Sequence, residues 1–176
     1  MPGGARLPRP ARRRRRHESA SRVITLATAT PADAAALAVL CVELDEFYGD
    51  TPEGSPDQRT AQVREALFGD LPGGQALLAW DDGAILAGFA SYSLLWPAAG
   101  LSTSLYLKEL YVGGSYRRAG VGKLLMEGLY LIAAERGCSR LEWTTDTGNQ
   151  AAQAFYASLG VKPLATKIFY RATGIT

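Results

Sequence analysis

The chain has 176 residues, of which 47% are hydrophobic and 20% charged, and its formal net charge is +2. A chain of this size and composition forms one globular domain with its own core, which excludes the fibrous and the largely disordered classes of protein. No apolar run approaches the roughly 20 residues that a membrane-spanning helix needs, so we expect no membrane association.

The positive charge is concentrated in residues 1–22, which carry eight Arg and one Glu and sum to +7. Residues 23–176 therefore sum to −5, so the rest of the chain is mildly acidic. Residues 1–21 lack apolar periodicity and contain the run Arg12–Arg16, which predicts a disordered, arginine-rich tail. An arginine run can bind nucleic acid. We favour a solvated tail, or a start codon assigned too far upstream, and expect no nucleic-acid partner.

Two cysteines and one histidine limit the chemistry of the chain. Cys41 and Cys138 lie far apart and outside any metal or redox spacing, so we expect reduced side chains, no metal site and a cytoplasmic protein. The histidine, His17, falls in the predicted tail, which leaves no histidine for a Ser–His–Asp triad or a zinc site. A general base must then be a carboxylate, a tyrosine or water.

The first part of the chain predicts one strand followed by two helices. Residues 22–27 form the strand, and Thr30 followed by Pro31 is typical of the start of a helix. Ser55 begins the second helix in the same manner, and this helix is expected to run to about Phe68.

The second part of the chain alternates strands and helices. Residues 75–80 and 84–95 flank Asp81-Asp82-Gly83, which predicts a β-hairpin. A buried strand over residues 105–112 comes next. The elements expected after it are a turn over 113–116, a helix that opens over 117–123 and stops at Gly137, a strand over 139–145, and a helix from Asn149. This order implies a mixed sheet with helices on its faces.

The loop after the 105–112 strand has the chemistry of an anion site. The first turn of a helix has unpaired backbone N–H groups and a partial positive charge. Gly120 and Gly122 have no side chains that would keep a ligand from that backbone, so phosphate groups can bind there. Arg117, Arg118 and Lys123 would add cationic donors.

Two common phosphate-binding patterns fail in this loop. Arg117 replaces the first glycine of the P-loop, and Leu125 replaces the third glycine of the dinucleotide fingerprint. What does fit is Arg117-x-x-Gly120-x-Gly122 after a strand, which resembles the acetyl-CoA signature of the GNAT superfamily of N-acetyltransferases. An ordinary strand–turn–helix without a ligand is the alternative.

A second pattern downstream strengthens the resemblance. Residues 149–160 have the sequence NQAAQAFYASLG, and their Asn-x-x-Ala, Phe-Tyr and Leu-Gly pairs are similar to the second half of the same family's core. The resemblance covers residues 105–174, and residues 169–174 look like the last strand of the diamine-acetyltransferase-like bacterial branch. It implies an α/β fold over residues 22–176, a single domain whose mixed, mostly antiparallel sheet is splayed at its centre and flanked by helices.

The resemblance also implies acetyl-CoA as co-substrate, with no metal. Backbone groups of Leu110 and Val112 would pair with the pantetheine arm like an added strand, and one N–H would polarise the thioester carbonyl. Asn149 would hydrogen-bond the same arm, or serve as a helix N-cap. The full set of expected cofactor-binding residues is Leu110, Tyr111, Val112, Arg117, Arg118, Ala119, Gly120, Val121, Gly122, Lys123, Asn149 and Tyr156.

Two residues are assigned to catalysis. Tyr156 matches the family's tyrosine near the CoA sulfur, so it is expected to donate a proton to the departing thiolate; core packing is the alternative for an aromatic residue here. Glu109 is the only acid on the 105–112 strand and is our candidate general base. In the diamine branch that acid lies one residue earlier, where this chain has Lys108, and a one-residue shift turns a side chain to the other face of a sheet.

The acceptor side is expected at the end of the first helix, which in the family helps to wall that site. Asp45, Glu46 and Tyr48 are the substrate-binding candidates, because an acidic wall favours a cationic amine. A solvated helix face is an equally open interpretation. Asp45, Tyr48 and Glu142 also stay open as partners in proton transfer.

These observations predict an acetyl-CoA-dependent N-acetyltransferase that works by direct transfer in a ternary complex. The expected acceptor is a small primary amine, such as a polyamine, an amino acid or an aminoglycoside-like drug. A protein N-terminal or lysine acetyltransferase is one alternative, and a non-catalytic acyl-CoA sensor is another. A homodimer is also open, because related folds often pair through their sheets or C-terminal strands.

Overall fold

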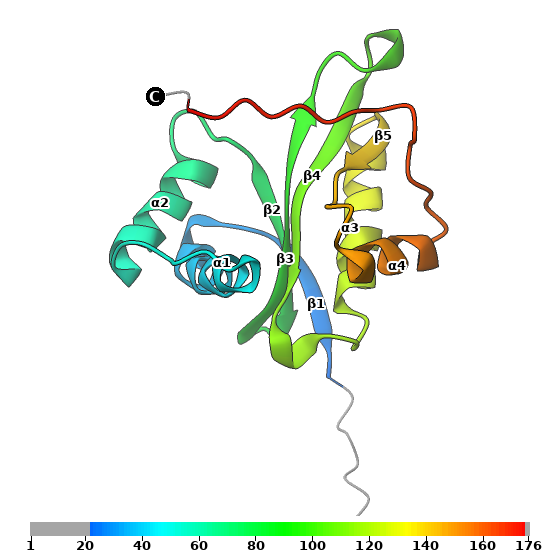
Figure 1. Cartoon of the computed structure of the whole chain (residues 1–176). Helices are drawn as coiled ribbons and strands as arrows, with labels where there is room; N and C mark the ends of the chain where they lie inside the picture. The colour runs from blue at the N-terminus through cyan, green and yellow to red at the C-terminus, as the bar shows by residue number, and fades with distance from the viewer. Residues whose placement is uncertain (1–21, 175–176) are drawn as a thin grey trace, which may run out of the picture.

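The structure, a computed structural model, describes residues 22–174. The predicted tail over residues 1–21, with Arg12–Arg16 and His17, lies outside the described residues. Within the described part the chain forms one five-stranded sheet with helices on both faces (Figure 1), as the sequence predicted. In residues 22–174 no helix combines the length and the apolar character needed to cross a membrane.

The sheet is mixed and mostly antiparallel. Its strands lie in chain order, from β1 to β5. The first four pair antiparallel with their neighbours, and β5 pairs parallel to β4, which confirms the expected topology. The strands are β1 (Ile24–Thr28), β2 (Gln75–Asp81), β3 (Ile85–Leu95), β4 (Thr103–Val112) and β5 (Cys138–Trp143).

Four α-helices cover the two faces of the sheet (Figure 1). On one face lie α1 (Ala34–Tyr48) and α2 (Pro56–Phe68). On the other lie α3 (Val121–Glu135) and α4 (Gln150–Ser158). Three short 3-10 helices occupy connections: η1 (Pro31–Asp33), η2 (Ala99–Leu101) and η3 (Gly114–Tyr116).

Local signals in the sequence set the ends of these elements. Ser55 and Gln58 form a capping box at the start of α2, with N–H to side-chain oxygen distances of 2.8 and 3.2 Å. Gly49 has a φ of 86°, the left-handed conformation that ends α1. Asp82 and Gly83 have φ values of 48° and 68°, as a tight hairpin turn requires. The predicted second helix and hairpin are confirmed.

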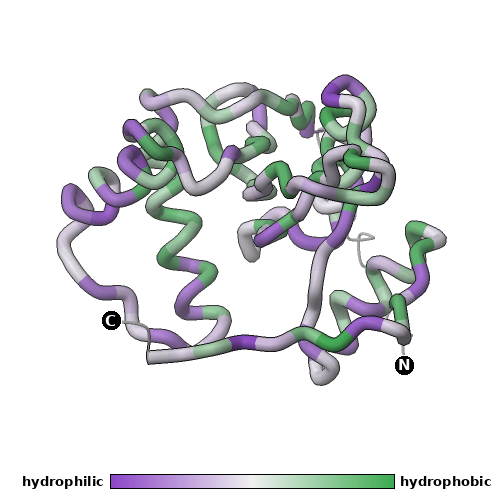
Figure 2. Tube along the Cα trace, turned by 90° about the horizontal axis from the view of Figure 1, so that it is seen from above, coloured by the Kyte–Doolittle hydropathy of each residue, from purple (hydrophilic) through white to green (hydrophobic). Residues whose placement is uncertain are grey.

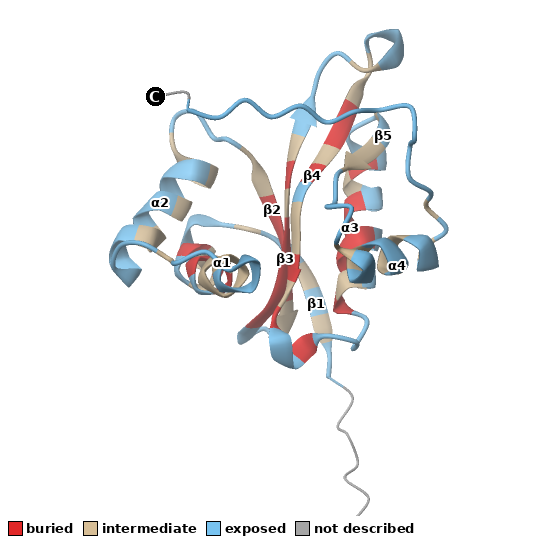
Figure 3. Ribbon diagram, in the orientation of Figure 1, coloured by how far each residue is buried: buried red, intermediate tan, exposed pale blue. Residues whose placement is uncertain are grey.

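A separate hydrophobic cluster lies on each face of the sheet. Leu105, Leu125 and Leu129 are fully buried between the sheet and α3. Leu37 and Phe89 are buried between the sheet and α1. Figure 3 shows buried segments along the central strands and on α1 and α3, the helices that pack on the two faces. Helices therefore cover both faces of the sheet, which leaves the loops at the edges of the sheet to form a ligand site.

The start of α3 differs from the prediction. The helix expected to open at residues 117–123 begins only at Val121. Arg118 and Gly120 have φ values of 64° and 85°, which lie in the left-handed region that an α-helix excludes. Residues 117–120 are therefore a loop that leads into the helix.

The prediction of a last strand over residues 169–174 is wrong. Residues 161–174 contain no strand, although β5 keeps one unpaired edge among the described residues. Ile168, Phe169 and Tyr170 are 75%, 62% and 84% exposed, and the segment lies apart from the sheet (Figure 2). The strand was expected from a resemblance in sequence, but a strand forms only where an edge lies beside the segment to pair with its backbone groups, and this segment meets none in the described chain.

Candidate active site

A β-bulge in β4 decides which side chains face the site. Adjacent residues of β3 pair with Leu107 and with Glu109, so Lys108 is an extra residue on β4. Leu107, before the bulge, packs in the cluster on the α3 face, whereas Tyr111, after it, packs in the cluster on the α1 face. Glu109 lies two residues from Tyr111 and therefore shares the α1 face.

The bulge determines what the one-residue shift between Lys108 and Glu109, noted in the sequence, does to the direction of the Glu109 side chain. In a regular strand Glu109 would lie on the same face as Leu107, beneath α3. With the bulge it faces α1 instead. There its carboxylate lies close enough to raise the pKa values of Cys41 and Tyr48, after the larger effect of burial. Glu109 therefore reaches the helix that was expected to wall the acceptor site.

Part of one edge of β4 is unpaired. The last residue pair between β4 and β5 joins Leu107 to Trp143, where β5 ends. Residues 108–112 continue on β3 alone, so among the described residues no strand pairs with them on the β5 side. The edge is left unpaired there because β5 ends at Trp143 whereas β4 continues to Val112, and an extended ligand can pair with such an edge as an added strand. The splay expected at the centre of the sheet stays a prediction.

The N-terminus of α3 has open backbone donors beside that edge. The first helical hydrogen bond runs from Leu124 N–H to Gly120 O at 3.0 Å, so the N–H groups of residues 121–123 have no helical partner. No side chain caps this helix. A Cβ on Gly120 would meet open space, and one on Gly122 would lie 3.4 Å from the Phe155 ring of α4. The helix end is therefore open at Gly120 and bounded by α4 at Gly122, and its free N–H groups suit an anion.

The side chains of residues 117–123 differ in exposure and in the groups they contact. Arg118, Ala119 and Lys123 are exposed, and Lys123 forms an ion pair with Glu127 at 3.6 Å. Val121 is buried in the core, so only its backbone is open to a ligand. Arg117 is engaged elsewhere, as described below, and its side chain does not stand with the other two cations over the helix end.

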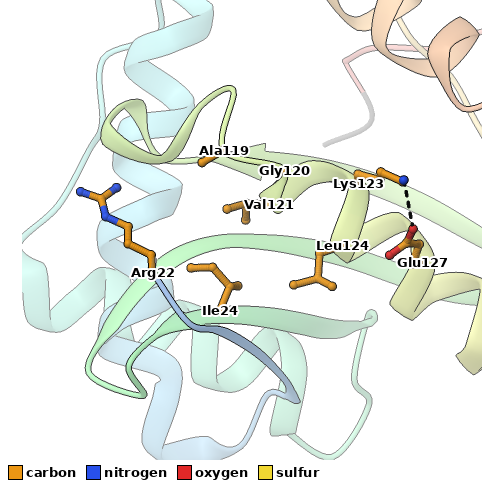
Figure 4. A pocket seen from close by; sticks show the side chains of 8 residues that line it. All are labelled: Arg22, Ile24, Ala119, Gly120, Val121, Lys123, Leu124 and Glu127. Atoms are coloured by element: carbon orange, nitrogen blue, oxygen red, sulfur yellow. Dashed lines mark ion pairs between the residues drawn. The ribbon is translucent and has the colours of Figure 1, made fainter. Parts of the chain in front are cut away.

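A hollow of ≈ 330 Å³ lies between this loop and β1 (Figure 4). Arg22 and Ile24 form one wall, and the Lys123–Glu127 pair lies at its rim. The hollow is on the β1 side of α3, whereas Gly122 faces α4. We therefore do not assign a thioester arm to this hollow, because the free edge of β4 lies on the α4 side.

Tyr156 lies on α4, with its ring packed against Trp143 of β5 and Phe155, at centroid distances of 5.0 and 5.2 Å. Burial raises the pKa of Tyr156 to about 12, with smaller contributions from Tyr48 and the Glu109 carboxylate. The hydroxyl therefore stays protonated across the neutral range, as a proton donor must.

Carboxylates gather where α1 faces β4. Burial, followed by Asp45 and Glu109, raises the pKa of the Cys41 thiol to about 11. Burial, followed by Glu109 and Asp146, raises the pKa of the Tyr48 hydroxyl. Two of the three predicted acceptor residues, Asp45 and Tyr48, are thus brought together with Glu109, and the surroundings are rich in negative charge.

Other predicted partners lie outside this group. Glu46 is exposed on the helix, next to Asp45 in sequence but turned away from it by about 100°. Glu142 lies on β5 and pairs with Arg140 at 2.9 Å. Lys108 contacts the Glu109 carboxylate at 2.9 Å, and its side chain is 67% exposed, which puts this cation at the rim.

Asn149 is the N-cap of α4, since its Oδ1 accepts a hydrogen bond from the Ala152 N–H at 3.0 Å. This confirms the capping role that was weighed for it. The cap uses only the carbonyl oxygen of the side chain, and its NH₂ group is left for another partner.

Sequence analysis missed Cys41, Trp143 and Asp146 as neighbours of the site. A signal existed for Cys41, because positions 41, 45 and 48 share one face of a helix. Trp143 and Asp146 come from the end of β5 and the loop after it. No spacing in the sequence relates them to Tyr156, because only the packing of α4 beside the end of β5 brings Trp143 and Tyr156 together.

Comparisons with known proteins agree with this geometry. The model of the acetyltransferase (GNAT) family matches residues 37–161, more than half of the chain. L-ornithine N5-acetyltransferase NATA1 of Arabidopsis thaliana is 29% identical over 90 residues, which are 51% of this chain and 40% of that protein. D-amino-acid N-acetyltransferase HPA3 of Saccharomyces cerevisiae is 33% identical over 87 residues, 49% and 53% of the two chains. The chain therefore spans about half the length of these curated relatives.

One solved structure is similar to this chain over most of the length of both chains. An integron cassette protein, VCH_CASS6, from the mobile metagenome of V. cholerae has a TM-score of 0.79 and 29% sequence identity, covering 86% of this chain and 93% of that one. The family match includes the unpaired edge of β4, the open end of α3 and the whole of α4. This chain belongs to the acetyltransferase (GNAT) family.

Proposed function

We propose that this chain transfers an acetyl group from acetyl-CoA to the primary amine of a small cationic molecule. One juxtaposition carries the proposal: Glu109, beside α1, and Tyr156, on α4, flank the unpaired edge of β4. A proton acceptor and a proton donor therefore stand on either side of the place where an extended ligand would join the sheet.

The residues present fit CoA. The open N–H groups of residues 121–123, with Arg118 and Lys123, suit a diphosphate. The free edge at residues 108–112 suits the amide groups of a pantetheine arm. Leu110, Tyr111 and Val112 contribute backbone only, because their side chains pack into the two clusters. When bound, acetyl-CoA supplies an activated acetyl group, and a backbone N–H of this edge would polarise its carbonyl.

Proton transfer is assigned to two side chains. Glu109 takes a proton from the ammonium group, directly or through a water molecule, so that the neutral amine can attack the carbonyl carbon. As the new C–N bond forms and the C–S bond breaks, Tyr156 gives its proton to the sulfur, and the nitrogen loses its second proton, which returns through water to the Tyr156 oxygen. Direct transfer needs no covalent acetyl-enzyme. Cys41, the one thiol near the site in the described chain, has its pKa raised to about 11 and is a poor nucleophile.

The acidic surroundings favour a cationic acceptor. Asp45, Glu109 and Asp146 all lie near Tyr48 or Cys41 and outnumber Lys108, the cation that pairs with Glu109, and an excess of one charge raises the local concentration of the opposite charge. Relatives of the chain are named for ornithine and D-amino acids. We therefore propose an amine with a second polar or charged group, such as a polyamine, as in the diamine-acetyltransferase-like branch, or a basic amino acid.

An amine panel tests the proposal against its alternatives. The panel holds a diamine, ornithine, a D-amino acid, an aminoglycoside and a lysine-containing peptide, and the readout is free CoA released from acetyl-CoA. We expect release with the small cationic amines, and release slower by about tenfold or more from the Glu109→Gln variant near neutral pH. Release with the peptide alone would indicate a protein acetyltransferase. Binding of CoA without release from any amine would indicate a non-catalytic sensor.

We also propose a homodimer formed through the C-terminal segment. Residues 161–174 expose apolar side chains, and β5 has a free edge that a strand of a second copy could join. Light scattering of the full chain and of a chain ending at Gly160 tests this. A monomeric full chain at micromolar concentration would contradict it. The cytoplasmic setting, proposed from the unpaired Cys41 and Cys138, awaits localisation of a tagged protein.

A further inference from the structure

The side chain of Arg117 bridges the phosphate loop and α1. Its Cζ atom lies 4.8 Å from the ring centroid of Phe47, on the last turn of α1, and 5.7 Å from that of Tyr111. Its Nε donates a hydrogen bond to Val112 O at 3.2 Å. Arg117 is therefore held by both a helix and a strand, although it belongs to the loop that leads into α3.

Tyr111 makes the same bridge from the strand. Its hydroxyl donates to the backbone oxygen of Glu43 at 3.3 Å, and lies 3.4 Å from the Glu43 carboxylate. It also accepts a hydrogen bond from the Arg117 guanidinium at 3.5 Å. Its ring packs against Phe47 at 6.4 Å. The end of α1 is thus joined to the loop by one connected cluster, formed by Glu43, Phe47, Tyr111 and Arg117.

The same turn of α1 carries the acceptor-side residues on an adjacent face. Asp45 and Tyr48 flank Phe47 in the sequence, and Tyr48 packs on Phe47 with 5.4 Å between ring centroids. A shift of Phe47 therefore moves the wall that faces Glu109. Phe47 and Tyr48 are 54% and 52% exposed, so core packing alone does not fix their positions.

We propose that Arg117 is a positioning residue that couples CoA binding to the acceptor site. The inference rests on the proposed function for the identity of both ligands. A diphosphate on residues 121–123 fixes the loop, the loop fixes Arg117, and Arg117 fixes the end of α1 in the position that an amine needs. Arginine suits this task because its planar, permanently charged fork can stack on aromatic rings and donate hydrogen bonds at once.

Coupling of this kind is reciprocal. If CoA raises the affinity for the amine by some factor, the amine raises the affinity for CoA by the same factor, which is typically about 5–150-fold. An arginine that merely bound phosphate would act differently, because its loss would weaken CoA binding whether or not the amine is present.

Hydrogen exchange of the purified full chain, with CoA as the probe, separates these two roles. In the wild type we expect CoA to slow amide exchange in the last turn of α1 by about tenfold, within the usual range of coupling. In Arg117→Gln we expect that protection to disappear while the CoA Kd changes by less than about threefold. A Kd raised by tenfold or more, with a weaker salt dependence, would make Arg117 a phosphate ligand and overturn the inference.

A second variant removes the other partner in the contact between Arg117 and Phe47. Phe47→Leu removes the ring from α1 without altering the loop, and it should abolish the protection to the same degree. Combined with Arg117→Gln it should add nothing further, since both remove one interaction. Additive losses would contradict a shared contact. Arg136→Gln is the matched control, because Arg136 is an exposed arginine at the far end of α3, and it should retain full protection.

Failure of the proposed function gives a different result. If no amine is acetylated but CoA protects α1 through Arg117, the function is wrong and the positioning role stands. If the chain does not bind CoA at all, the ligand-free proteins still test the contact. Exchange at the end of α1 should then be faster in Arg117→Gln than in the wild type, and equal rates would overturn the inference.

Discussion

The CoA side and the acceptor side of the proposed site are formed by different groups. The proposed CoA side consists of backbone groups, namely the free edge of β4 and the N–H groups at the start of α3. The proposed acceptor side consists of side chains, with Asp45 and Tyr48 on α1 near Glu109 on β4. Backbone groups bind what is common to every acyl-CoA, whereas side chains can change without loss of the fold. Substrate choice should therefore depend on α1, and cofactor binding should not.

The largest effect is expected on the CoA side. In Gly122→Val the new methyl groups would lie near the Phe155 ring and over the open N–H groups. We expect CoA affinity, measured by calorimetry, to fall by about 100-fold or more, since several charge-assisted hydrogen bonds are blocked together. Gly114→Ala is the matched control, because a Cβ there meets nothing within 4 Å. Equal affinity of the two variants would remove the loop from the cofactor site.

Tyr156→Phe should separate chemistry from binding. We expect turnover to fall by about 100-fold, the usual contribution of a general acid, with little change in acetyl-CoA affinity. The pKa of the wild-type hydroxyl is raised to about 12, so this hydroxyl should keep its proton below pH 10. Loss of that proton should therefore not lower turnover in this range. Tyr130→Phe, which alters an exposed tyrosine of α3, should be unaffected. A loss of affinity that matches the loss of turnover would make Tyr156 a packing residue.

Glu109→Gln tests the proposed general base, which lies between the CoA side and the acceptor side of the site. A carboxylate that accepts a proton works only when ionised, so the wild-type rate should fall on the acidic side of its pH–rate profile. The variant should lose about tenfold or more in rate near neutral pH and show a flattened acidic limb. Glu135→Gln, on the exposed side of α3, serves as control. An unaltered acidic limb would assign the base to another group.

The smallest effect is expected on the acceptor side. Asp45→Asn should raise the KM for a cationic amine by about two- to fivefold, the range of a partly exposed ion pair, and added salt should reduce the difference. The CoA Kd should not change. Glu46→Gln should have a smaller effect, because Glu46 is turned toward solvent. If both variants raise KM equally, the acceptor reaches further along α1 than proposed.

The sequence predicted the backbone half of the site better than the side-chain half. The glycines at 120 and 122 identify the loop, and the tight turn at Asp82-Gly83 fixes the hairpin. By contrast, Lys108 is a bulge residue only because β3 and β4 shift in register. The sequence of one strand does not indicate such a shift. The role of Arg117 depends on Phe47, which lies 70 residues away in the chain.

Two errors had the same physical origin. The predicted last strand failed because the resemblance of residues 169–174 to a family's last strand does not say which edge, if any, lies beside these residues. The start of α3 was placed too early because Arg118 adopts a positive φ that composition does not indicate. Local patterns predict which elements form, and long-range partners decide where the elements end.

Calorimetric titration of the purified chain with CoA and with acetyl-CoA tests the central claim most directly. The account predicts saturable heat with both ligands in the wild type and its loss in Gly122→Val, with Gly114→Ala unaffected. No heat with either ligand, or the same heat from Gly122→Val as from the wild type, would contradict it.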